Sequence, residues 1–148
     1  MQKIEQLKLK GELQVVLNKA DGSQETHDFK NLVVDTGLNF IVERMKEDVV
    51  TAMTHMELGE GTTAAAAGDT TLESAIAGSR TGLTSTTVAT NTITYVATFG
   101  AGTGTGAVTE AGLFNGASGG TMLCRTVFPV VNKQAGDSMT VTWVVTVS

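Results

Sequence analysis

Charged residues are scarce over the larger part of this chain. After residue 62 the sequence holds only three basic and four acidic residues, which are Arg80, Arg125, Lys133, Asp69, Glu73, Glu110 and Asp137. The net charge of the whole chain is −5. Because a negative chain with so few cations is a poor partner for a nucleic-acid backbone or an anionic membrane, we expect neither as a partner.

Cysteine and long apolar runs are also nearly absent. The single cysteine, Cys124, excludes an intrachain disulfide framework, so a hydrophobic core must hold the fold together. No stretch approaches the roughly 20 apolar residues of a membrane span. The N-terminal sequence "MQKIEQLKLK" mixes charged with apolar residues and is unlike a signal peptide. We therefore expect a soluble protein made in a reducing compartment.

The chain has enough apolar material for one core. Its 148 residues, 41% of them hydrophobic, have the size of one domain, and we assign residues 1–148 to a single β-sandwich domain. Residues 1–10 form either an extended N-terminal arm or a first strand, and the sequence leaves both open.

A period of two in the side chains dominates the sequence. At the C-terminus, Met139, Val141 and Trp143 alternate with threonines, which is typical of a strand with one buried face. Similar patterns occupy residues 12–18, 25–34, 53–58, 83–88, 93–99, 108–114 and 121–128. The pattern predicts a mainly β protein, an antiparallel β-sandwich or jelly roll of about eight or nine strands with one or two short helices.

Two segments depart from this period. Apolar residues at helical spacing predict a helix over residues 37–48, capped by Asp35 or Thr36. A second, weaker helix is expected at residues 70–77, where Thr70 and Glu73 have the spacing of a capping box.

Two glycine-rich segments resemble enzyme motifs. "GAGTGTG" at residues 100–106 lacks a following helix and a later acidic residue at the distance that a dinucleotide site needs. "GASGG" at residues 116–120 surrounds Ser118 but has no histidine after it. We interpret the first as a connection between two strands and the second as a hairpin loop.

Other candidates for chemistry are few. His55, Glu57 and Glu60 lie close in sequence but are more typical of a solvated edge than of a metal site. Cys124 falls on an apolar face and has no neighbouring base. Aromatic residues make up 5% of the chain, too few for an evident sugar-binding platform. We predict no catalytic, metal-binding or cofactor-binding residue, no cofactor, and a protein that is not an enzyme.

One hairpin can be aligned residue by residue. Folding residues 108–114 onto 121–128 with Phe114 opposite Thr121 places Glu110 directly opposite Arg125. Opposite charges paired across strands contribute roughly 0.2–1 kcal/mol. A direct pair of this kind predicts that exchanging the two charges restores the stability lost in Arg125→Glu.

The order of these segments resembles a known group of proteins. The segments "LGEGTTAAAAGDTTL" and "TEAGLFNGASGGTMLCRTVF", with the final strand, resemble small virion proteins of tailed bacteriophages. That group comprises tail-fibre or collar-like proteins and capsid decoration (cement) proteins. The resemblance covers roughly residues 30–148 and implies a protein that assembles in copies, often as a homotrimer.

The resemblance implies a structural protein of the virion that is made in the host cytoplasm. The short chain favours decoration of the capsid surface, where the protein would bind the major capsid protein and bridge capsomers; a tail, collar or fibre adaptor is the alternative. A carbohydrate-binding β-sandwich module is a third, weaker hypothesis. Ile4, Leu7 and Leu9 are candidates for contact with the capsid or with another subunit.

Overall fold

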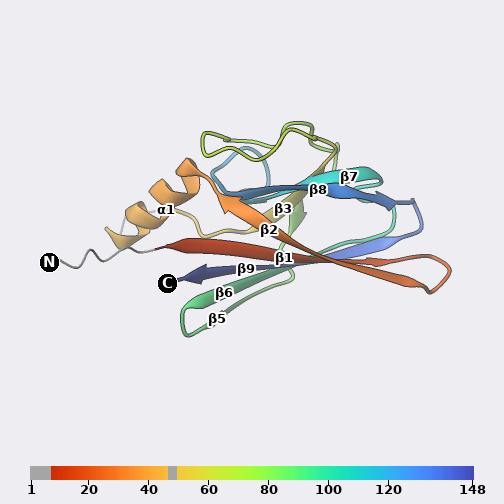
Figure 1. The fold of residues 1–148 in the computed structure, drawn as a ribbon, viewed down its shortest axis with the longest axis horizontal. Coiled ribbons are helices and arrows are strands. Elements are labelled where there is room, and N and C mark those ends of the chain that lie inside the picture. Colours follow the sequence, from red (N-terminus) through yellow and green to blue (C-terminus); the bar gives the residue numbers. More distant parts are fainter. Residues whose placement is uncertain (1–7, 47–49) are drawn as a thin grey trace, which may run out of the picture.

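The protein is mainly β, as the sequence predicts. The computed structural model describes residues 8–46 and 50–148. Within these ranges it forms nine strands and one helix, which are β1 (Leu9–Asn18), β2 (Gln24–Val33), α1 (Asp35–Met45), β3 (His55–Gly59), β4 (Thr81–Gly82), β5 (Ser85–Ala89), β6 (Thr92–Phe99), β7 (Gly106–Phe114), β8 (Met122–Lys133) and β9 (Ser138–Val147) (Figure 1).

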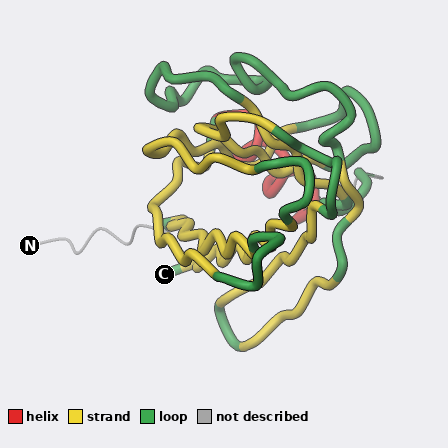
Figure 2. Tube along the Cα trace, turned by 90° about the vertical axis from the view of Figure 1, so that its right-hand side faces the viewer, coloured by secondary structure: helices red, strands yellow, loops and turns green. Residues whose placement is uncertain are grey.

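All nine described strands belong to one antiparallel sheet. Their order is β4-β3-β7-β8-β2-β1-β9-β6-β5. The sheet curls so that its two halves face each other across the core, a sandwich-like arrangement (Figure 2). The halves meet where β2 pairs with β8 through two residue pairs, Leu32 with Arg125 and Val33 with Cys124. The far ends of the sheet are joined by residues 83–84, since Leu83 N–H donates to Thr54 O and Thr84 N–H to Val96 O, at 2.8 and 2.7 Å.

Alternating burial explains why these segments form strands. In β9, Met139, Val141, Trp143 and Val145 are buried, and the residues between them are half-buried. These four side chains meet the inward residues of β1, where Leu13 lies opposite Trp143. One face of each strand thus enters the core, and β-branched threonine suits the face that does not.

The N-terminal arm is only partly described. Leu9 is the first residue of β1, half-buried and packed against the core, so the first-strand interpretation holds for residues 9–10. Ile4 and Leu7 lie outside the described residues.

Helix α1 confirms the first predicted helix but not its cap. The N-cap residue is Val34, which makes no side-chain capping bond. Thr36 instead donates its hydroxyl to Met122 O at 2.7 Å and fastens the helix to β8. Gly37 and Phe40 are the buried residues of α1. Of the apolar residues at helical spacing, Leu38, Val42 and Met45 are exposed, whereas Ile41 is half-buried and packs against the core.

The second predicted helix, at residues 70–77, is wrong. Residues 60–80 form an irregular loop with one isolated bridge, between Gly59 and Ala75. The capping box fails because Glu73 turns away from Thr70 and accepts the backbone N–H groups of Thr62 and Thr63.

The β7–β8 hairpin exists, but its predicted register is wrong by two residues at the charged pair. Arg125 lies opposite Gly112, and Glu110 lies opposite Val127. Register shifts occur between Val108 and Glu110 and between Leu113 and Phe114. Such bulges redirect side chains, so a register counted from a regular hairpin cannot be carried through them.

None of the described helices is long and apolar enough to cross a membrane.

Candidate functional site

Residues 60–80 form a long loop that covers the outer face of β7 and β8. Figure 1 shows this loop above the two strands, on the side opposite the core. Leu72, from the loop, is buried in a second apolar cluster with Val34, Phe114 and Met122. Every residue of β7 from Val108 to Phe114 is therefore buried, because the core covers one face of the strand and the loop covers the other.

Glu110 is the centre of the contacts that hold this loop. The residue is completely buried. Its Oε1 accepts the N–H groups of Ser74 and Gly61, at 2.7 and 3.2 Å. Its Oε2 accepts the N–H of Glu73 at 3.0 Å, and both Nε and Nη2 of Arg125 at 3.0 and 2.8 Å. A buried carboxylate with partners on both oxygens is fully used as a structural acceptor.

Arg125 joins Glu110 to the outer part of the loop. Its guanidinium is almost completely buried and donates from Nη1 to Asp69 Oδ2 at 2.8 Å and from Nη2 to Thr63 O at 3.1 Å. Burial by itself lowers the pKa of Arg125, but the hydrogen bonds and negative charges of Glu110 and Asp69 outweigh it and raise that pKa. The guanidinium therefore stays charged and links two carboxylates to one strand.

Two of the loop's own carboxylates, Glu73 and Asp69, shape the loop itself. Glu73 Oε1 accepts the N–H groups of Thr62 and Thr63 at 2.9 and 3.3 Å. Hydrogen bonds from the Thr63 side chain and from these two backbone groups lower the pKa of Glu73. Asp69 Oδ2 accepts the N–H of Ala66 at 2.9 Å. Two of the loop's three acidic side chains, Glu73 and Asp69, thus accept hydrogen bonds from the loop's own backbone.

The end of the loop is fastened by Arg80 and Ser79. The Arg80 guanidinium lies 3.7 Å from the centre of the Phe114 ring, over its face, and 3.3 Å from a Glu57 carboxylate oxygen. It also donates to Gly116 O at 2.8 Å. Buried Ser79 binds the backbone of Leu58 through its hydroxyl, both as donor and as acceptor. These contacts join the loop to β3 and to the β7–β8 turn.

Two positions that pack closely against the Glu110 side chain, 59 and 61, require glycine. A Cβ at Gly59 would lie 2.4 Å from Glu110 Oε1, and a Cβ at Gly61 would lie 2.7 Å from the same atom. The "LGEG" sequence at residues 58–61 therefore leaves room for the carboxylate beside β3.

We call residues 60–80, held by these contacts, the clamped loop. Its outward side carries small, mostly uncharged side chains. The exposed residues between positions 62 and 71 are Thr62, Thr63, Ala64, Ala66, Ala67, Gly68, Thr70 and Thr71. Because short side chains have little rotamer freedom to lose and the backbone beneath them is fixed, this surface would lose little conformational entropy on contact with a partner.

The remaining predicted candidates lie elsewhere. The "GAGTGTG" segment connects β6 to β7, as expected, with Gly102 and Gly104 at φ of 80° and 68°. His55 contacts Thr54 at 2.7 Å, whereas Glu60 accepts the N–H of Ala107. No group of three or more metal-ligating side chains occurs in residues 8–46 and 50–148.

Cys124 lies in the core. Burial raises the pKa of its thiol to about 12, so the group stays protonated at neutral pH.

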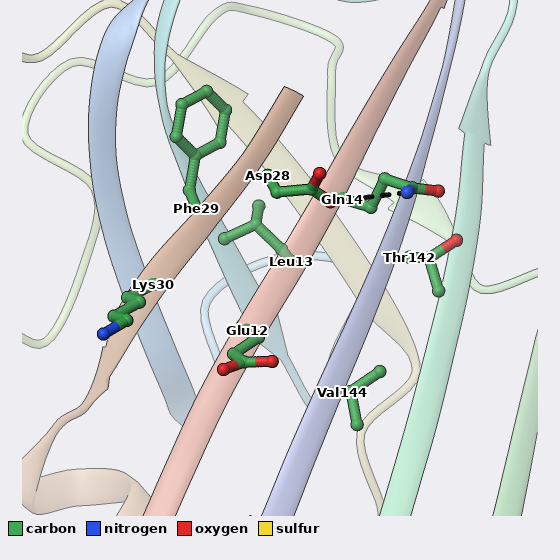
Figure 3. A pocket seen from close by; sticks show the side chains of 8 residues that line it. All are labelled: Glu12, Leu13, Gln14, Asp28, Phe29, Lys30, Thr142 and Val144. Atoms are coloured by element: carbon green, nitrogen blue, oxygen red, sulfur yellow. Dashed lines mark hydrogen bonds between the residues drawn. The ribbon is translucent and has the colours of Figure 1, made fainter. Parts of the chain in front are cut away.

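A shallow groove crosses the outer face of β2, β1 and β9 (Figure 3). Across it Gln14 donates to Asp28 at 3.3 Å. Phe29 stacks on Phe128 with ring centres 4.6 Å apart rather than offering its face to a ligand. The groove has no convergent polar groups that would define a small-molecule site.

Sequence reasoning found the Glu110–Arg125 contact but missed the residues that make it a site. Asp69 and Glu73 were available as signals, because they are the other two acidic residues between residues 62 and 136. The assignment of Glu73 to a helix over residues 70–77 concealed its part in the network, and Asp69 lies directly before that segment. The backbone donors from Gly61, Glu73 and Ser74 left no signal in the sequence.

The fold and this site define a mainly β, sandwich-like protein in which a buried ionic network fixes a long surface loop. Comparison with known proteins finds no matching family, no matching curated protein and no matching solved structure.

Proposed function

We propose that this chain is a structural protein of a tailed-bacteriophage virion, which decorates the outer capsid and stabilises it by bridging capsomers. The observation that carries the proposal is the clamped loop. The network of Glu110, Arg125 and Asp69 holds in place a surface of small side chains, residues 62–71. An assembly subunit gains from such a surface, because ordering the loop is part of folding and does not weaken binding.

The resemblance of the sequence to phage virion proteins gives the biological setting. Its two most specific segments, residues 58–72 and 109–128, are the loop and the hairpin that the network joins. If both segments are needed to build one surface, a protein that has this surface must contain both of them. The proposed partner of that surface is the major capsid protein.

The distribution of aromatic residues disfavours the carbohydrate-binding alternative. Sugar sites use exposed aromatic faces. Six of the seven aromatic side chains are buried, and the seventh, Phe29, is half-buried and stacked on Phe128. The tail or collar adaptor remains the second candidate, because the same clamped surface would serve on a tail.

Co-sedimentation with phage particles tests the proposal. The purified protein is mixed separately with heads that lack it and with isolated tails, and the bound fraction is measured over a concentration series. We expect saturable binding to heads. Binding to tails alone would replace decoration with the adaptor function, and binding to neither would overturn both.

A matched pair of variants tests the surface. Ala66→Arg adds a bulky charge to the exposed side of the clamped loop, whereas Ala135→Arg adds it to the exposed β8–β9 turn. We expect Ala66→Arg to weaken head binding at least about tenfold, as one lost central contact does, and Ala135→Arg to leave it unchanged. Equal binding by both variants would exclude the loop as the contact surface.

A further inference from the structure

Strand β5 (Ser85–Ala89) is an open edge of the sheet. It pairs with β6 on one side and with no other described strand on the other. All five of its residues are exposed. In Figure 2 the β5–β6 hairpin forms the lowest part of the molecule, away from the clamped loop at the top.

The edge has none of the usual protection against pairing. Natural sheets cover or interrupt free edges with lysine, proline, bulges or very short strands. The sequence "STTVA" contains no charge and no proline, and its register with β6 is regular over all five residues. No charged residue occurs between Arg80 and Glu110.

The hairpin turn fixes which backbone groups face outward. Thr90 and Asn91 form a two-residue turn, with Thr90 at φ of 55°, so Ala89 and Thr92 form its closing hydrogen-bonded pair. Alternation along an antiparallel ladder then directs the backbone N–H and C=O groups of Thr86 and Val88 away from the sheet.

We propose that β5 is a self-association surface on which a second copy of this chain adds its own β5 in antiparallel orientation, with the two Thr87 residues opposite each other. Two features select a second copy as the occupant. The edge is neutral, so placing it against itself brings no like charges together. Its outward donors and acceptors, on Thr86 and Val88, are symmetric about Thr87 and complement those of an antiparallel copy.

The pairing also covers exposed apolar surface. Val88 is 70% exposed and lies opposite Ile93 on the side of the hairpin that faces the core. In the paired arrangement Val88 of each copy lies beside Thr86 of the other. A five-residue strand is only about 17 Å long, so we expect a weak, concentration-dependent dimer.

This contact is independent of the proposed virion function, and it differs from the homotrimer that the resemblance implies. A two-fold contact produces a dimer, whose mass is twice the 15.4 kDa of the chain. Sedimentation equilibrium over a concentration series therefore distinguishes the two assemblies.

Disulfide trapping tests the geometry directly. In Thr87→Cys, two facing residues of a non-hydrogen-bonded pair have the Cβ separation that a disulfide needs. The native Cys124 is buried and does not compete. The control is Thr98→Cys, an exposed position on β6, away from the edge. We expect oxidised Thr87→Cys to give a covalent dimer on a non-reducing gel and Thr98→Cys to remain monomeric.

A charge at the same position gives the reverse test. Thr87→Lys sets two ammonium groups against each other, and we expect the concentration-dependent rise in sedimenting mass to disappear, whereas Thr98→Lys retains it. Cross-linking of Thr87→Cys no faster than Thr98→Cys, or an assembly unaffected by Thr87→Lys, would overturn the proposal.

Discussion

At Glu110, one carboxylate receives three backbone N–H groups and two N–H groups of a guanidinium. The pairing with Arg125 could be predicted, because both charges stand in a region that has few others. The backbone donors could not, because they belong to residues 36 to 49 positions earlier in a loop without periodicity. A contact between two side chains was thus visible in the sequence, while the reason for its burial was not.

Glu110→Gln should destabilise the protein by about 3–5 kcal/mol, since it leaves the buried Arg125 charge without its main partner. The free energy of unfolding from urea denaturation measures the change. The control is Glu12→Gln, which removes an exposed ion pair with Lys10 and should have little effect.

Exchanging the charges should not restore stability. In the variant carrying Glu110→Arg and Arg125→Glu, the arginine at position 110 offers no acceptor to the N–H groups of Gly61, Glu73 and Ser74. The swap test therefore fails although the ion pair is real, which corrects the expectation from a simple cross-strand pair. Recovery of native stability in the double variant would show that the loop does not depend on the carboxylate.

Among the elements, α1 lies where the sequence predicts a helix, but most of its periodic apolar residues do not face the core. Its apolar period predicts a helix, but the periodic residues Leu38, Val42 and Met45 are exposed. The helix instead presses its Gly37 backbone against β8, where a Cβ would lie 2.3 Å from Leu123 O. Periodicity identifies a helix that can be half-buried, while the shape of the neighbouring strand decides which face is covered.

Gly37→Ala should lower stability, although alanine is the better helix former by roughly 1 kcal/mol. The contact with the Leu123 backbone cannot move away easily, so we expect a net loss of about 1–3 kcal/mol, typical of overpacking. Thermal or urea unfolding measures it. Gly68→Ala is the control, because nothing lies within 4 Å of its Cβ position, and it should be nearly neutral. A stabilised Gly37→Ala protein would contradict the close contact.

The loop of residues 60–80 should loosen in acid through Glu73. The folded-state pKa of this carboxyl is lowered by the hydroxyl of Thr63 and the N–H groups of Thr62 and Thr63. Its contribution is therefore fully present above the ordinary value of 4.5 and is lost as pH falls through the lowered folded value.

NMR titration of the Thr62 and Thr63 amide protons measures this step. We expect both signals to shift together with a midpoint below 4.5. The Glu73→Gln variant should lack the transition, because the amide does not ionise. An unchanged transition in that variant would assign it to another group.

At the scale of the whole molecule, the curled sheet brings distant segments together. Strands β1 and β9 pair along ten residues, and Lys8 and Ser148 exchange backbone hydrogen bonds at 2.8 and 2.9 Å. Residues 83–84 join the opposite ends of the sheet. The contacts between neighbouring strands therefore close the sheet on itself at residues 83–84 and bring the two ends of the described chain together. We expect the fold to depend on these contacts rather than on the order of the segments along the chain.

A circular permutant tests this closure. The termini are joined by a short glycine-serine linker, and the chain is opened between Asp21 and Gly22, in the exposed β1–β2 turn. Because β1 and β2 keep their neighbours in the sheet, we expect native far-UV circular dichroism and a single cooperative unfolding transition. Loss of cooperative unfolding would show that the β1–β2 turn is needed to assemble the sheet.

The class of this fold could be predicted from the sequence. Alternating side chains in β1, β6 and β9 are a local property, since a strand with one buried face needs a period of two wherever it lies in the sheet. The glycine-rich connection at residues 100–105 and the position of the first helix follow from equally local signals.

Three features could not be predicted in this way: the register of β7 and β8, the buried face of α1 and the placement of residues 60–80. Each depends on contacts between segments far apart in the chain. Bulges shift the register, a neighbouring backbone selects the helix face, and one buried carboxylate collects donors from a loop that has no pattern of its own. The period of two along the sequence predicts the fold class. The candidate site, in contrast, forms only where β7, β8 and the loop of residues 60–80 come into contact.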